Sequence, residues 1–180
     1  MTTENKYEWG QFRRSLTDLE HVKVLIVEDS DIDFYLVERI MAHKMPWACD
    51  VIRAETIQQA EGILKDKQYQ IDIVLLDLGL PDSASPQDTY QQLSRYKDQC
   101  PIVILTSIED HLMALEMLGI GAQDYVCKNM ILMQPELLVR IMEFSIGRHR
   151  SLKSSRVEME QKLAQTSELL NLMSGSYSAG

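Results

Sequence analysis

The 180-residue sequence has no apolar run that approaches the roughly 20 residues a membrane-spanning helix needs. It opens with residues such as Thr2, Glu4 and Glu8, which do not form the basic and apolar stretches of a secretory leader. The three cysteines are widely spaced and fit neither a disulfide framework nor a metal-binding pattern. From these absences we expect a cytoplasmic protein with reduced thiols and no membrane partner.

Basic residues are also scarce. The net charge is −9, and residues 131–180 carry six Lys/Arg and five Asp/Glu, so residues 1–130 carry −10. Binding to phosphate backbones requires a basic face, so the acidity argues against nucleic acid as a direct partner. The sequence contains no internal repeat and no low-complexity tract.

What the sequence does contain is a regular alternation of short apolar runs and helical patterns, with 45% hydrophobic and 25% charged residues. Strands are predicted over residues 22–27, 49–53, 71–77, 101–105 and 122–127. Helices are predicted over residues 32–45, 56–67, 87–98 and 109–118. This order indicates an α/β domain with a doubly wound parallel sheet and right-handed crossovers.

Two helical stretches allow finer predictions. In the first helix, Ile32, Leu36, Ile40 and Met41 are expected to form the buried stripe, with Ser30 or Asp31 as the cap. After Pro135 a long C-terminal helix is predicted up to Gly175, because no helix breaker intervenes. An imperfect heptad seam along this helix favours a homodimer, and fraying of an isolated helix is the alternative. The seam positions are Leu138, Met142, Ser145, His149, Leu152, Arg156, Met159, Leu163, Thr166, Leu170 and Met173.

These patterns divide the chain into four parts. Residues 22–150 are predicted to form the globular domain, residues 151–174 a coiled-coil extension and residues 175–180 a flexible tail. Residues 1–21 form an N-terminal extension in which Trp9, Phe12, Leu16 and Leu19 have helical spacing. That extension is either a short amphipathic helix or a loosely ordered segment.

Chemically active side chains follow several of the predicted strands. Glu28 and Asp29 follow the first strand, Asp77 ends the third, and Thr106 and Lys128 follow the fourth and fifth. Because the carboxyl ends of parallel strands lie at one edge of a sheet, these side chains are expected to converge near the point where strand order reverses. Asp77 taken alone could equally be a loop cap, but the full set in order favours a site.

The residues around these positions resemble the receiver domain of two-component response regulators over residues 22 to about 150. The matching segments are Val-Leu-Ile-Val-Glu-Asp-Ser at 24–30, Leu-Leu-Asp-Leu-Gly-Leu-Pro-Asp at 75–82, Ile-Val-Ile-Leu-Thr-Ser at 102–107 and Gly-Ala-Gln-Asp-Tyr-Val-Cys-Lys at 121–128. The resemblance implies a flavodoxin-like sheet with strand order 2-1-3-4-5. It also implies a phosphoacceptor that is not itself an enzyme.

By the same resemblance, Asp77 takes a phosphoryl group from a sensor histidine kinase or phosphotransfer protein. Glu28, Asp29, Asp77 and the Gly79 carbonyl would bind Mg²⁺, and Lys128 would bind a phosphate oxygen. Thr106 and Tyr125 would form the coupled switch, although Tyr125 could instead be a half-buried strand residue.

The sequence departs from the family pattern at three places. Asn129 stands where a proline usually follows the lysine, and residues 83–86 lack a glycine that is common in that loop. Gly79 and Ile108, two residues beyond Asp77 and Thr106, have no polar side chain to orient a hydrolytic water. We therefore expect the acyl phosphate to be lost slowly.

Two other functions were weighed. The Asp29-Ser30-Asp31 segment is similar to that of haloacid-dehalogenase-type phosphatases, but Asp33 stands where those enzymes have Thr or Val. A protein-interaction or dimerisation module with vestigial phosphorylation is the second alternative. Residues 146–150 resemble connectors into kinase or diguanylate cyclase domains, yet no Gly-Gly-Asp/Glu-Glu-Phe motif occurs. We expect either a fragment of a multidomain regulator or a receiver that acts by dimerisation.

Overall fold

The computed structural model describes residues 21–175, so the prediction of a helix near Trp9 and Phe12 and the expected flexible tail beyond Gly175 lie outside it. Five parallel strands form one sheet in the order β2-β1-β3-β4-β5. The strands are β1 (His21–Val27), β2 (Ala48–Ala54), β3 (Ile73–Leu76), β4 (Ile102–Thr106) and β5 (Asp124–Cys127). This arrangement confirms the predicted doubly wound sheet and its strand order.

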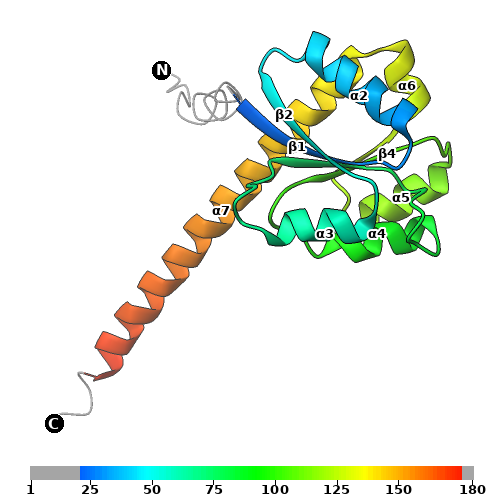
Figure 1. Cartoon of the computed structure of the whole chain (residues 1–180). Coiled ribbons are helices and arrows are strands. Elements are labelled where there is room, and N and C mark those ends of the chain that lie inside the picture. Colours follow the sequence, from blue (N-terminus) through cyan, green and yellow to red (C-terminus); the bar gives the residue numbers. More distant parts are fainter. Residues whose placement is uncertain (1–20, 176–180) are drawn as a thin grey trace.

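Helices cover both faces of the sheet (Figure 1). One face packs against α3 (Ile57–Lys65), α4 (Pro86–Ser94) and α5 (His111–Gly119). The other packs against α2 (Asp31–Lys44), α6 (Lys128–Met133) and the first turns of α7 (Glu136–Gly175). Because both faces are covered, the central strands β3 and β4 are buried along their whole length, which explains their unbroken apolar sequences.

The helix ends follow the expected capping chemistry. The Ser30 side chain accepts a hydrogen bond from the Asp33 N–H, and Thr56 accepts one from the Gln59 N–H. The predicted inward position of Ile32 is wrong, because 81% of that residue is exposed. The helix instead buries Val37, Ile40 and Met41, so its fully buried stripe begins more than one turn later than predicted.

The fifth strand is followed directly by a helix that was not predicted from the sequence. Helix α6 begins at Lys128, and Ile131 is its buried contact with the core. The described residues contain no cis peptide bond, so Asn129 joins Lys128 through a trans bond. Asn129, which stands where the family usually has a proline, is therefore the second residue of a helix.

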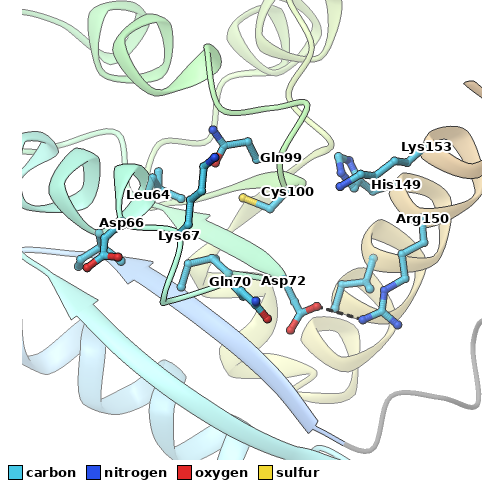
Figure 2. A pocket seen from close by; sticks show the side chains of 13 residues that line it. Leu64, Asp66, Lys67, Gln70, Asp72, Gln99, Cys100, His149, Arg150 and Lys153 are labelled. Carbon is cyan, nitrogen blue, oxygen red and sulfur yellow. Dashed lines mark hydrogen bonds and ion pairs between the residues drawn. The ribbon is translucent and has the colours of Figure 1, made fainter. Parts of the chain in front are cut away.

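The long helix α7 leaves the domain at the amino edge of the sheet, where a cavity of about 450 Å³ separates it from the ends of α3 and β3 (Figure 2). Arg150 Nη2 lies 3.0 Å from Asp72 Oδ1, and Asp72 Oδ2 accepts the Lys23 N–H at 3.0 Å. This ion pair fixes the helix to the edge opposite the strand ends that carry the acidic residues. In residues 21–175, no helix is apolar enough over a sufficient length to cross a membrane.

Candidate functional site

Asp77 lies directly after β3 and is held by backbone contacts on both sides. Its own N–H donates to the Val27 carbonyl at 2.9 Å, which extends the pairing of β3 with β1. Its Oδ2 accepts the Gly79 N–H at 2.8 Å. A Cβ atom on residue 79 would lie 3.0 Å from the same Oδ2, so a glycine is what lets the backbone approach the carboxylate.

Glu28 and Asp29 follow β1, the neighbouring strand, at the same edge of the sheet. One carboxylate oxygen from each of Glu28, Asp29 and Asp77 lies within 4.8 Å of the others. Glu28 and Asp77 are buried and Asp29 is exposed, so the cluster is open to solvent on one side. Three mutually repelling oxygen donors around an open position suit a hard divalent cation such as Mg²⁺. The donor set therefore fits the predicted metal.

Burial is the largest influence on Glu28 and raises the pKa of its carboxyl group, while the hydrogen bond from Lys128 opposes that rise. Lys128 itself is 5% exposed. Its Nζ contacts Glu28 Oε2 at 2.6 Å and Asp77 Oδ1 at 3.1 Å. Burial alone would lower the pKa of Lys128, but hydrogen bonds to Asp33 and Glu28 and the charge of Asp77 raise it above its ordinary value. These contacts favour the charged form of the lysine, which supplies positive charge beside Asp77.

Two residues that contact this cluster were not identified from the sequence as part of the site. Asp33, on the first turn of α2, has its Oδ2 2.7 Å from Lys128 Nζ. Arg53, at the end of β2, donates from Nε to the Glu28 carbonyl and from Nη2 to the Asp29 carbonyl, both at 3.1 Å. Arg53 thereby orients the backbone of the acidic pair. Asp33 follows Asp29 by four residues, but this spacing does not indicate a contact with Lys128, and nothing in the β2 sequence distinguished Arg53.

The predicted switch residues lie farther along the same edge. Thr106 is buried, and its Oγ1 accepts the Ile108 N–H at 3.3 Å; the described structure contains no hydrogen bond between Thr106 and Asp77. Tyr125 is half-buried and donates its hydroxyl to the Ile108 carbonyl at 2.8 Å. Both side chains therefore hold the same loop residue, although they come from different strands.

A parallel sheet with three clustered carboxylates and a buried lysine at its carboxyl edge defines a class of phosphoryl-accepting α/β domains. The family model described as the response regulator receiver domain matches residues 24–142. The chain belongs to the response regulator receiver family and is a receiver domain of two-component signalling. This match does not favour the phosphatase or the vestigial alternative.

Individual relatives agree with the family. The transcriptional regulatory protein PmrA of Pectobacterium parmentieri is 30% identical over 145 residues, which are 77% of this chain and 59% of that protein. The transcriptional regulatory protein BasR of Escherichia coli strain K12 is 32% identical over 126 residues, which are 67% of this chain and 52% of that protein. The chain thus spans a little over half the length of these relatives.

Solved structures show the same fold. The beryllofluoride-activated N-terminal receiver domain of Klebsiella pneumoniae RstA is 25% identical, with a TM-score of 0.56, over 69% of this chain and 97% of that one. The signal receiver domain of a LuxO repressor protein from Vibrio parahaemolyticus has a TM-score of 0.62 at 21% identity, over 75% of this chain and 97% of that one.

Proposed function

We propose that Asp77 is the phosphoacceptor and that its donor is a phosphohistidine on a sensor kinase or a phosphotransfer protein. The observation that supports this most directly is the 3.1 Å contact between Asp77 Oδ1 and Lys128 Nζ, beside the carboxylates of Glu28 and Asp29. An acceptor carboxylate needs nearby positive charge, and this contact provides it.

In the proposed reaction an Asp77 oxygen attacks phosphorus, the phosphorus–nitrogen bond breaks, and its electron pair returns to the imidazole. Lys128 holds an oxygen of the transferred group as a compact positive charge. Glu28, Asp29, Asp77 and the Gly79 carbonyl are the proposed ligands of Mg²⁺. When bound, that ion would neutralise charge on the phosphoryl group.

The proposed relay uses Thr106 and Tyr125. Thr106 Oγ1 accepts the Ile108 N–H, and a rotation of this side chain that lets the hydroxyl donate to a phosphoryl oxygen would break that contact. The Ile108 carbonyl also anchors the Tyr125 hydroxyl, so a movement of this loop residue changes the position of both side chains. Tyr125 packs on the face of the sheet that α5 covers, and its hydroxyl lies 3.9 Å from Met113 Sδ of α5, so its movement would alter the surface of β5 and α5.

In this proposal, α7 connects the receiver domain to an output domain or a partner and transmits the signal to it. Along this helix Leu152, Met159, Leu163 and Leu170 are each 61% to 69% exposed. Their spacing of seven, four and seven residues matches a heptad seam, which a second copy of the same helix would cover. We therefore propose a homodimer through residues 151–174.

The phosphoacceptor is tested by incubating the chain with acetyl phosphate and Mg²⁺ and separating phosphorylated protein on a phosphate-binding gel. The wild-type chain and the control Asp98→Asn are expected to shift, whereas Asp77→Asn is expected not to. Asp98 is a suitable control because its side chain is 72% exposed and pairs with Arg156 far from the site. Continued uptake by Asp77→Asn would overturn the proposal, and turnover of p-nitrophenyl phosphate would favour a phosphatase.

A further inference from the structure

The Lys128 ammonium contacts more carboxylates than the proposed reaction requires. Its Nζ lies 2.6 Å from Glu28 Oε2, 2.7 Å from Asp33 Oδ2 and 3.1 Å from Asp77 Oδ1. A lysine ammonium has three hydrogens to donate, and three carboxylates lie close enough to compete for them. The contact with Asp33 has the geometry of a hydrogen bond. A phosphoryl oxygen that binds Lys128 must therefore compete with these carboxylates.

Of Glu28 and Asp33, the two contacting carboxylates that are not themselves phosphorylated, Asp33 can give up this contact at the lower cost. The Glu28 side chain is 4% exposed and also accepts the Ser30 N–H at 3.2 Å, so losing Lys128 would leave a buried charge poorly compensated. The Asp33 side chain is 31% exposed, and water can replace the ammonium there. Asp33 also lies outside the group of carboxylates that are close enough together to share a metal ion in the described chain.

The charge of Asp33 opposes the binding of an anion. The carboxylates of Glu28, Asp33 and Asp77 contact the single Lys128 ammonium, so these four groups together carry a formal charge of −2. Asp33 contributes one of these charges without being a predicted metal ligand. Its negative charge therefore lowers the positive electrostatic potential that attracts a phosphoryl group. Its contact also occupies the lysine that this group would bind.

We propose that Asp33 is a positioning residue that holds Lys128 in the unphosphorylated protein and releases it to the phosphoryl group. The inference rests on the proposed function of Asp77. Because Asp33 and the phosphoryl group compete for one ammonium, Asp33 sets how strongly the receiver holds its phosphoryl group. The contact also couples the first turn of α2 to phosphorylation, since Asp33 loses its partner when Lys128 moves.

The competition is tested by titrating beryllofluoride, a phosphoryl mimic, into the chain at saturating Mg²⁺ in a calorimeter. Asp33→Asn removes the charge and keeps the side-chain shape, and Glu38→Gln removes an equal charge from the same helix away from Lys128. Asp33→Asn is expected to bind beryllofluoride about two- to fivefold more tightly, the range for a partly exposed ion pair. Glu38→Gln is expected to match the wild type. Unchanged or weaker binding by a folded Asp33→Asn protein would overturn the proposal.

A second measurement needs neither metal nor phosphoryl group. In metal-free protein, the ¹⁵N-labelled Lys128 ammonium, assigned by its loss in Lys128→Arg, is expected to exchange its protons slowly. Asp33→Ala should speed this exchange and Glu38→Gln should not; equal exchange in all three proteins would show that Asp33 does not hold Lys128. If the wild-type chain binds no beryllofluoride, the proposed function of Asp77 fails, and the ammonium signal still decides the contact.

Discussion

At the scale of single residues, the close approach of Gly79 to Asp77 leads to a sharp prediction. A Cβ atom at position 79 would lie 3.0 Å from Asp77 Oδ2, whose hydrogen bond from the Gly79 N–H is 2.8 Å long. Gly79→Ala is therefore expected to displace the carboxylate and to weaken Mg²⁺ binding by about tenfold, as for other changes next to metal ligands. Calorimetric titration with Mg²⁺ measures this, and wild-type affinity in the variant would contradict it.

The lifetime of the acyl phosphate depends on residues that could orient water. Gly79 and Ile108 offer no polar side chain there, so we expect slow loss of phosphate from purified, Mg²⁺-loaded protein. Replacing the half-buried Ile108 with glutamine adds a hydrogen-bonding group and is expected to shorten the lifetime several-fold. Release of inorganic phosphate over time measures both, and rapid loss from the wild-type chain would contradict the prediction.

Tyr90 leads to a prediction about pH. It is 0% exposed, and burial raises the pKa of its phenol from an ordinary value of 10.0 to about 12. Because the folded-state pKa is raised, the stability that Tyr90 contributes is fully present below pH 10 and is lost as the pH rises towards about 12. Tyr90→Phe should remove this alkaline loss of stability. Chemical denaturation below pH 10 and near pH 12 would measure the free energy of unfolding of both proteins. An unchanged alkaline loss of stability in the variant would contradict it.

At the scale of elements, α3 contains a glycine that the fold does not require. Nothing lies within 4 Å of a Cβ placed on Gly62, which lies inside this helix. Gly62→Ala should raise the free energy of unfolding by about 0.5–1 kcal/mol, from helix propensity alone, and leave Mg²⁺ affinity unchanged. Thermal and chemical denaturation test the first part, and the variant is also the matched control for Gly79→Ala. A loss of stability would show an unseen contact at this position.

The elements themselves were largely predictable from sequence, because buried strands and capped helices leave direct patterns. The run of residues that forms β3 is apolar throughout and those of β1 and β4 are mostly apolar, and Ser30 and Thr56 cap the helices that they precede. Helix α6 was not predicted because it starts at the last strand without a side-chain cap. The predicted burial of Ile32 was wrong because helical periodicity gives the spacing of a buried stripe but not the residue at which the stripe begins.

The site was only partly predictable, because sequence patterns show where strands end but not which side chains pack together. Strand ends are visible in sequence, so Glu28, Asp29, Asp77 and Lys128 could be expected to converge, and they do. Contacts made by side chains from other elements are not visible, because they depend on packing geometry. The contact of Asp33 with Lys128 therefore became apparent only in the structure.

At the scale of the whole molecule, α7 is tied to the domain by the ion pairs Arg150–Asp72 and Arg156–Asp98, and beyond them it extends away from the domain in the described chain. If its seam forms a dimer, Leu163→Lys should abolish the dimer, whereas Gln165→Lys adds the same charge off the seam and should not. Sedimentation analysis with and without beryllofluoride measures both. A wild-type chain that stays monomeric at high concentration in both conditions would contradict the proposed dimer.

The central claim is that the acidic edge of the sheet makes Asp77 the residue that is phosphorylated. The most direct measurement is to phosphorylate the chain with acetyl phosphate and Mg²⁺, reduce the acyl phosphate with borohydride, and map the modified residue by peptide mass spectrometry. The account predicts that Asp77 alone is converted to homoserine and that omission of Mg²⁺ prevents the conversion. Conversion of another carboxylate, or none at Asp77 in protein that carries phosphate, would contradict it.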